Sequence, residues 1–336
     1  MQPRQPFHLA SMLALLAGGG VAGALAPTTA PAQVTRLFED KTVPFEEGFR
    51  VYLVPDMEGM GSTVHITEVI AGNEGERYRD LTSSDYWEHY RQLLTLEANA
   101  VIEGARAAGA ASFAVNEGHG GNRFANVLPW ELDPEALLVR GYPKPMVMST
   151  GIDSTFATMM FTGAHAAPPV HAVMSHNYAF QEFSVNGRPL NEVAINALIG
   201  GAKGVSVSMV SGDDVLIAQT REMLDNGFIG VITKVAVGHN AAVTYSPQRV
   251  REMLREAAEE AVKREMAGDF EPFVLETPYE VEFTLRSSYP DDVVAAVDTI
   301  STYGLEKAGE RAYRMVTEDA DQIGYLLDAI EEIVLP

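Results

Sequence analysis

The sequence predicts an α/β fold, with a Rossmann-like three-layer domain followed by a smaller C-terminal α+β domain. Short apolar runs alternate with longer segments in which apolar residues recur at three- and four-residue steps, as strands and helices do. The chain has 336 residues and is 46% hydrophobic, so it can bury a sizeable core. The sequence pattern changes near residue 272, after which YEVEFTL alternates apolar and polar residues with a period of two, as a strand does. This change divides the α/β domain, 49–271, from the α+β domain, 272–336.

The N-terminal 32 residues have the features of a signal peptide. An early arginine precedes the apolar stretch LASMLALLAGGGVAGALA, and Ala30-Pro31-Ala32 then offers a small-residue cleavage site. A membrane anchor is the alternative, but the three glycines at 18–20 are unfavourable in a membrane-spanning helix. We expect removal of residues 1–32, a polar lead-in over residues 33–48, and a periplasmic or secreted mature chain that is not attached to a membrane.

Apolar runs mark the strands of the larger domain. Those predicted as strands are VYLVP (51–55), SFAVN (112–116), ALLVRG (136–141), ATMMFTGAH (157–165), AVMSH (172–176) and VSVSMVSGDD (205–214). The Asn-Gly pair in FSVNGRPL, residues 183–190, is typical of a hairpin turn. These strands give the sheet on which the fold prediction depends.

Helical periodicity places the helices between these strands. Apolar residues at helical spacing predict a helix over 84–108 that ends before Gly109. The clearest helix runs from 247 to 267, because Ser246 can cap it and a proline suits its first turn. LNEVAINALIGG is a further helix after the hairpin. In the smaller domain we expect a helix near 290–302, the strand RAYRMVT and a helix near 319–333.

Charge and cysteine content exclude several functions. The formal net charge is -22, and so acidic a surface argues against binding nucleic acid, which requires clustered Lys and Arg. There is no cysteine, which excludes disulfides and thiolate chemistry. Any metal site must therefore be built from His, Asp and Glu.

Two acids directly follow the first predicted strand. In an extended chain alternate side chains share a face, so Asp56 and Glu58 are expected to point the same way. Two neighbouring carboxylates repel each other unless a cation lies between them or one takes a proton. A metal site, an acid/base pair and a solvated turn all remain open from this doublet alone.

Further metal-binding side chains follow other apolar runs. Ligands of α/β sheets bind at the carboxyl ends of the strands, where the loops gather. His119, His165 and His176 each stand just past a predicted strand or at its end, and Glu192 lies near the start of the helix after the hairpin. Imidazole and carboxylate without sulfur form a donor set suited to a hard or borderline divalent ion.

The remaining histidines and one acidic pair have simpler interpretations. We interpret His171 as structural, His239 as a loop residue that could also line a pocket, and His65 and His89 as surface or capping residues. Asp213 and Asp214 end a strand, where they could reach the site or cap the next helix; their position favours the cap.

Six short motifs in order resemble a known family, the zinc-dependent D-aminopeptidases of the DppA kind. The motifs are DMEG (56–59), NEGH (116–119), GAHA (163–166), MSH (174–176), NGRPLNEVAINA (186–197) and SGDD (211–214). The resemblance implies two zinc ions per subunit, with the ligands Asp56, Glu58, His119, His165 and Glu192. It further implies that Asp56 bridges the ions, and that the family's catalytic histidine is His176, which would move a proton or stabilise the oxyanion.

The function expected from this resemblance is that of a di-zinc aminopeptidase. It would hydrolyse short peptides with an N-terminal D-amino acid through a metal-activated water. The family also implies a ring-like homo-oligomer, a decamer. An exported solute-binding protein for peptides is the alternative, because it would share the leader, the α/β build and the acidic surface. Metal content separates the two functions.

Overall fold

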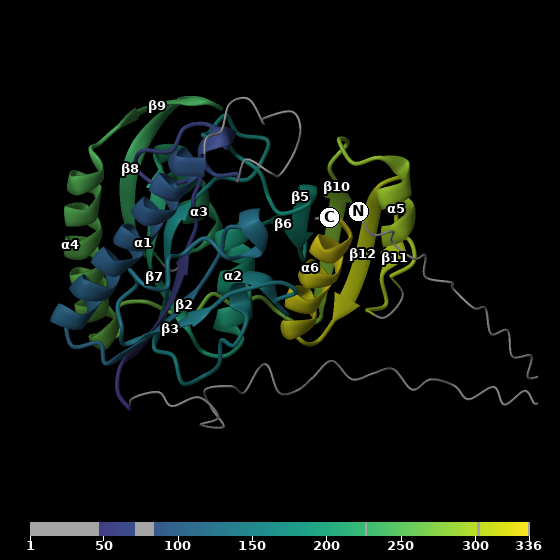
Figure 1. Cartoon of the computed structure of the whole chain (residues 1–336). Helices are drawn as coiled ribbons and strands as arrows, with labels where there is room; N and C mark the ends of the chain where they lie inside the picture. Colours follow the sequence, from purple (N-terminus) through teal and green to yellow (C-terminus); the bar gives the residue numbers. More distant parts are fainter. Residues whose placement is uncertain (1–46, 71–83, 226, 301–302, 335–336) are drawn as a thin grey trace, which may run out of the picture. The chain divides into compact units, whose positions relative to one another are not determined.

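The larger sheet of the computed structural model has seven strands. They are β1 (Arg50–Pro55), β2 (Ser112–Asn116), β3 (Ala136–Val139), β4 (Thr158–Ala164), β7 (Ser206–Asp213), β8 (Ile229–Gly238) and β9 (Ala241–Thr244). Their order is β3-β2-β1-β4-β7-β8-β9, and every pairing is parallel except that of β8 with β9 (Figure 1). The structure describes residues 47–70, 84–225, 227–300 and 303–334. The predicted signal peptide and most of the lead-in lie outside this part of the chain.

Helices cover both faces of this sheet (Figure 1). They are α1 (Ser84–Ala107), α2 (Glu192–Gly201), α3 (Asp214–Met223) and α4 (Pro247–Met266). Helix α1 packs against α4 on one face, and α2 packs against α3 on the other. The predicted three-layer α/β arrangement is confirmed. Buried strands such as β1 and β4 are mostly apolar because helices cover both of their sides.

A second sheet is antiparallel and has five strands. They are β5 (Phe180–Val185), β6 (Arg188–Pro189), β10 (Tyr279–Leu285), β11 (Glu306–Lys307) and β12 (Ala312–Thr317), in the order β11-β12-β10-β5-β6. Its helices are α5 (Asp291–Val297) and α6 (Asp321–Val334). The predicted hairpin is present as β5 and β6, and its turn places Asn186 and Gly187 at positive φ.

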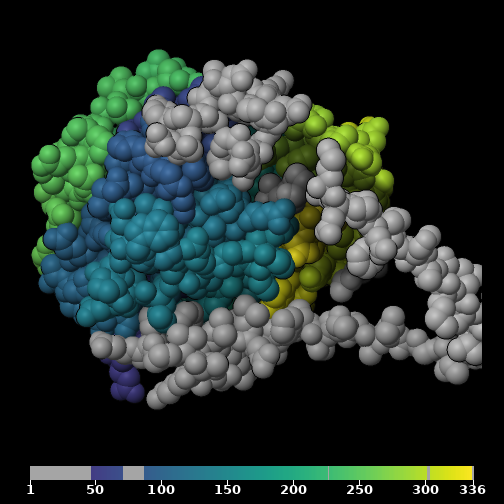
Figure 2. Space-filling model, viewed as in Figure 1, coloured from purple at the N-terminus to yellow at the C-terminus, as the bar shows by residue number. Residues whose placement is uncertain are grey.

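The hairpin joins the C-terminal strands rather than the larger sheet. Strand β5 pairs with β10 along Val185 to Phe180, so the second sheet combines two distant parts of the chain. Helix α6 packs on α2, and the rings of Phe180, Phe283 and Tyr313 form part of the core between the strands and helices. Figure 2 shows the yellow surface of α6 beside the teal surface of the larger sheet's loops. A separate domain beginning at residue 272 stays a prediction.

Three short helices complete the described structure, and some predicted elements differ from it. The short 3-10 helices are Ile66–Glu68, Gly121–Arg123 and Val147–Ser149. AVMSH is not a strand: Met174 has φ 47° and its N–H bonds to the carbonyl of His239, so this apolar segment is buried as a loop. The helix predicted near 290–302 ends at Val297. Within the described residues no helix combines the length and apolarity needed to cross a bilayer.

Candidate metal centre

The predicted site residues converge where the strand order of the larger sheet reverses. Strands β1 and β4 are neighbours at this point, and ligands of doubly wound sheets bind outside the carboxyl ends of such strands. Asp56 directly follows β1, His165 directly follows β4, and His119 lies three residues after β2. The parallel sheet therefore brings together side chains from segments more than 100 residues apart.

A tight turn, not an extended strand, places the two acids of DMEG. Strand β1 ends at Pro55, and residues 57–60 bend away from the strand. The N–H of Asp56 donates to Thr162 (2.8 Å), and the N–H of Gly59 donates to Gly163 (2.6 Å). Gly163 has φ +70°, and a Cβ there would overlap the carbonyl of Asp56. The alternation expected from an extended chain was thus wrong, although the two acids do meet.

The first ligand group comprises Asp56, Glu58 and His119. Nδ1 of His119 lies 3.1 Å from Oε2 of Glu58 and 3.5 Å from Oδ1 of Asp56. One donor atom from each of the three residues lies within 4.8 Å of the others. All three side chains are buried. The carbonyl of His119 also accepts a hydrogen bond from Nδ2 of Asn126 (2.8 Å), which holds the loop in place.

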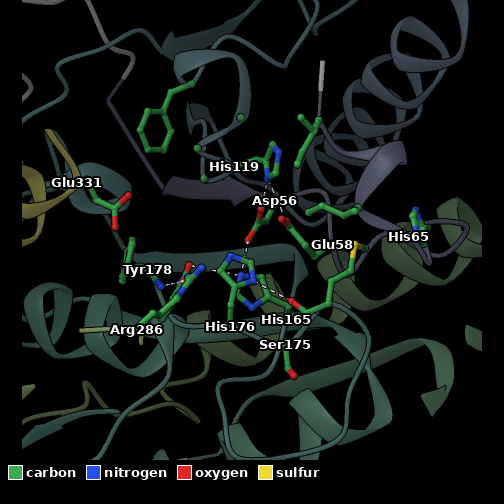
Figure 3. A pocket seen from close by; sticks show the side chains of 18 of the residues that line it. Asp56, Glu58, His65, His119, His165, Ser175, His176, Tyr178, Arg286 and Glu331 are labelled. Atoms are coloured by element: carbon green, nitrogen blue, oxygen red, sulfur yellow. Dashed lines mark hydrogen bonds and ion pairs between the residues drawn. The ribbon is translucent and has the colours of Figure 1, made fainter. Parts of the chain in front are cut away.

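The second ligand group comprises His165, His176 and Glu192, whose donor atoms also lie within 4.8 Å of one another. Nε2 of His165 is 3.6 Å from Oε2 of Glu192 and 3.6 Å from Oδ2 of Asp56. Glu192 begins α2, which Asn191 caps by accepting from the N–H of Ala194 (2.9 Å). Asp56 therefore faces both groups, one oxygen toward each, and Figure 3 shows these side chains turned toward one another.

Hydrogen bonds to backbone carbonyls set the orientation of all three histidines. Nε2 of His119 lies 2.6 Å from the carbonyl of Val69, and Nδ1 of His176 lies 2.8 Å from that of Met174. Nδ1 of His165 makes a longer contact, 3.3 Å, with its neighbour's carbonyl. A carbonyl only accepts, so each of these nitrogens carries the proton. The second nitrogen of His119 and of His165 faces carboxylates, the arrangement of metal-bound histidines.

Histidine 176 stacks on His165. Their ring centroids are 3.8 Å apart and the rings are nearly parallel, at 12°. The N–H of His176 donates to the carbonyl of Ala166, which ties the two loops together (3.0 Å). The structure thus brings the predicted catalytic residue to the second ligand group, with Nε2 not engaged by the backbone.

The pKa shifts show that the buried carboxylates stabilise positive charge on the neighbouring histidines. Burial and the charge of Glu58 raise the pKa of Asp56 to about 7. Although burial acts against it, the charge of His119 holds the pKa of Glu58 well below its usual range. Burial likewise opposes ionisation of His165, but the carboxylate of Glu192 raises its pKa to about 10. Protons on histidines supply here the positive charge that bound cations would supply, so the donor set fits divalent ions.

A cavity of about 980 Å³ opens over both groups. The predicted site residues line it, together with residues that the sequence did not indicate: Tyr178, Arg286, Tyr289 and Glu331. His239, interpreted from the sequence as a loop residue that could also line a pocket, does line the cavity. His65 lines it as well.

Of the other residues singled out from the sequence, two cap helices and two lie on the surface. His65 caps a short helix by accepting from the N–H of Thr67. Asp213 caps α3 by accepting from the N–H of Leu216 (2.8 Å), as its position favoured. His89 and His171 are exposed.

The model of the D-aminopeptidase family matches residues 49–328. This chain belongs to the D-aminopeptidase family. It is 32% identical over 209 residues to the D-aminopeptidase of Bacillus subtilis (strain 168), an alignment that covers 62% of this chain and 71% of that protein. The family resemblance and the peptidase class predicted from the six motifs are confirmed, and the solute-binding alternative gains no support.

A solved structure of this family is also similar in fold. The zinc-dependent D-aminopeptidase DppA from Bacillus subtilis, described as a self-compartmentalizing protease, matches with a TM-score of 0.73 and 25% sequence identity. The match covers 85% of this chain and 98% of that chain. The D-aminopeptidase fold therefore extends over most of the residues that the structure describes.

Proposed function

We propose that this protein is an exported, zinc-dependent D-aminopeptidase that removes a D-amino acid from the amino end of short peptides. One observation carries the metal assignment: Asp56 turns one carboxylate oxygen toward His119 and the other toward His165. The zinc dependence described for the solved relative supports the choice of metal. The donor set, imidazole and carboxylate without sulfur, is one that zinc accepts.

Two zinc ions per subunit match the two ligand groups if His176 of the second group is reserved for proton transfer. Glu58 and His119 would hold one ion, His165 and Glu192 the other, with Asp56 between them. Bound there, the ions supply Lewis acidity and lower the pKa of water toward neutrality. Because the buried carboxylates sit at the cavity floor, they also favour the ammonium end of a peptide over a blocked end.

His176 is the group proposed to move the proton. Its Nδ1–H is held by a backbone carbonyl, so Nε2 is free to accept or donate a proton at the reacting atoms. Burial, together with the charge of His165, lowers the pKa of His176 to about 4. The ring is therefore neutral at physiological pH, with Nε2 unprotonated and able to accept a proton.

Assembly and export complete the proposal. The solved relative is described as self-compartmentalizing, which supports a homo-oligomer that encloses its active sites; the ring-like decamer comes from the resemblance alone. The leader over residues 1–32 supports a periplasmic or secreted enzyme acting on peptides from outside the cell or from its wall. Recovery of exported protein that begins at Gln33 is expected, whereas an unprocessed cytoplasmic chain would contradict export.

Metal analysis combined with a peptide assay tests the proposed function. We expect about two zinc ions per wild-type chain, fewer in His119→Ala, and no change in His171→Ala, which removes an exposed histidine instead. The zinc-loaded chain should hydrolyse D-Ala-L-Ala faster than L-Ala-L-Ala. A wild-type chain that binds no zinc, and gains no hydrolysis when zinc is added, would overturn the proposal.

A further inference from the structure

One wall of the cavity carries a cation and a carboxyl group that belong to neither ligand group. Arg286 directly follows β10, and Glu331 lies on α6, so both come from the C-terminal part of the chain. Both line the same cavity as Asp56 and His176, and Figure 3 shows them in the same pocket as the metal-centre residues. Because Arg286 and Glu331 belong to neither ligand group, metal binding does not explain why they line the cavity.

Both residues are anchored to the backbone of one residue, Ala179, close in the chain to the candidate metal centre. The N–H of Arg286 donates to the carbonyl of Ala179 (3.1 Å), and the N–H of Ala179 donates to the carboxylate of Glu331. Ala179 lies three residues after His176. These hydrogen bonds fix the backbone of Arg286 and the carboxylate of Glu331 relative to the proposed catalytic residue.

Neither side chain has its hydrogen-bonding capacity filled within the described part of the chain. Glu331 is only 7% exposed, yet its Oε1 has no hydrogen-bond partner there. The guanidinium of Arg286 likewise forms no hydrogen bond or ion pair with any described residue, Glu331 included. Buried polar groups are normally paired, so Oε1 of Glu331 is placed for a donor of a ligand, and the half-buried guanidinium of Arg286 in the same cavity is available to an acceptor of that ligand.

The charge of Arg286 is not cancelled by its neighbour. Burial, with a contribution from the charge of Glu192, raises the pKa of Glu331 to about 8, so this carboxyl is mostly protonated at neutral pH. Arg123 also lines the cavity, but its guanidinium lies over the ring of Tyr142, 5.9 Å from the centroid. Arg286 is therefore the guanidinium that remains available to an anion.

We propose that Arg286 is a specificity-determining residue that binds the free α-carboxylate of a short peptide substrate. Oε1 of Glu331 would face the adjoining amide N–H. A guanidinium matches a carboxylate with two parallel, charge-assisted hydrogen bonds. The inference rests on the proposed aminopeptidase function and adds its substrate class: peptides short enough for the carboxylate to reach Arg286 while the first peptide bond lies at the metal centre.

The test compares D-Ala-D-Ala with the same dipeptide carrying a carboxyl-terminal amide. We expect wild-type kcat/KM to favour the free acid by about tenfold or more, the usual effect of one hydrogen bond between charged groups. Arg286→Gln should bring this ratio toward one, through a higher KM for the acid alone. Arg286→Lys should keep part of the ratio, and Arg123→Gln, the matched loss of a cavity cation, should keep all of it.

Several outcomes would overturn the inference. An equal loss on acid and amide in Arg286→Gln would mean that the residue acts on the reacting atoms or on the fold. If Arg123→Gln rather than Arg286→Gln abolishes the preference for the free acid, the substrate carboxylate binds Arg123 and the inference is wrong. Equal hydrolysis of both substrates by the wild type would overturn this inference alone, whereas hydrolysis of neither would overturn the proposed function with it. If Arg286→Gln does not fold, an unchanged ratio in Arg286→Lys together with a poor KM for both substrates would count against the proposal.

Discussion

Oδ2 of Asp56 lies 3.6 Å from Nε2 of His165, and the other oxygen of the same carboxylate lies 3.5 Å from Nδ1 of His119. A single buried side chain therefore connects two groups of donor atoms that come from separate strands. The two oxygens of a carboxylate can serve two cations at once. Asp56 is thus the residue on which both halves of the proposed site depend.

Removal of this shared carboxylate should affect both ions. We expect Asp56→Asn to lose most of the zinc from both positions and to lower kcat/KM at least about 100-fold, whereas Glu58→Gln and Glu192→Gln should each mainly lose one ion. Glu182→Gln, which changes an exposed acid, should retain full zinc content. Zinc per chain is measured by elemental analysis after dialysis. Equal zinc losses in all three ligand variants would contradict a shared position for Asp56.

The loop that carries His119 depends on a buried amide. Nδ2 of Asn126 donates to the carbonyl of His119 (2.8 Å), and the N–H of Asn126 donates to the carboxylate of Glu117. Asn126→Ala should weaken zinc affinity about 10- to 100-fold, as loss of a residue supporting a metal ligand typically does. Excess zinc should restore activity. Competition with a chelator measures the affinity.

A partly buried asparagine provides the control for this variant. Nδ2 of Asn99 donates to the carbonyl of Glu131 (2.7 Å), away from the cavity. Asn99→Ala should lower the free energy of unfolding by about 1–3 kcal/mol and leave zinc affinity unchanged. If Asn126→Ala were equally neutral toward zinc, its amide would have only a structural role.

Gly163 is required by close contact as well as by backbone conformation. Gly163 and Gly204 have similar φ values, +70° and +81°, but a Cβ overlaps the carbonyl of Asp56 only at Gly163 and meets nothing within 4 Å at Gly204. Gly204→Ala should cost only the conformational strain, about 1–2 kcal/mol. Gly163→Ala should cost more and also lower zinc content. Thermal unfolding and zinc analysis check both, and equal effects would argue against the close contact.

The pH dependence of stability should reveal the buried carboxyl of Glu97. Its Oε1 accepts from the N–H of Gly61 (3.4 Å), its Oε2 has no partner among the described residues, and burial raises its pKa from 4.5 to about 7. Between these values the folded chain holds a proton that the unfolded chain has released, so stability falls as the pH rises toward 7. Above pH 7 the destabilisation is complete, up to about 3 kcal/mol.

Glu97→Gln should remove this dependence. The free energy of unfolding of the variant minus that of the wild type should be larger at pH 8.5 than at pH 5. The reason is that the amide of the variant carries no charge at either pH, whereas Glu97 of the wild type is ionised at pH 8.5. Urea unfolding at both pH values measures the difference, and Glu182→Gln serves as the exposed control. A wild-type-to-variant difference that is the same at both pH values would show that Glu97 ionises normally.

Local patterns predicted β1, β2, β3, β4 and β7 of the larger sheet because these strands are apolar runs between helices with clear periodicity, but β8 and β9 were not among the predicted strands. AVMSH shows the limit of such patterns, since its apolar residues are buried in a loop without pairing. The pairing of β5 with β10 left no local signal either, because it joins residues nearly 100 positions apart. Pairing over such separations is decided by packing in three dimensions.

The residues of the candidate metal centre could be selected from the sequence, and the structure brings them together, whereas the residues of the opposite wall could not be selected. Asp56, His119 and His165 each stand at the end of an apolar run, and the order of the motifs identified the family. Arg286 follows an ordinary strand, and Glu331 lies within an ordinary amphipathic helix. Glu331 is buried with an unpaired oxygen and Arg286 lines the same cavity, and both facts become visible only when the second sheet and α6 meet the cavity.

Anomalous scattering from a zinc-containing crystal tests the central claim most directly. Data collected at the zinc absorption edge locate the ions without reference to activity. We expect two peaks per chain, one within about 2.0–2.2 Å of Asp56, Glu58 and His119, and one at similar distances from Asp56, His165 and Glu192. A single peak, or a pair of peaks that Asp56 does not touch, would contradict the shared position of this carboxylate between two ions.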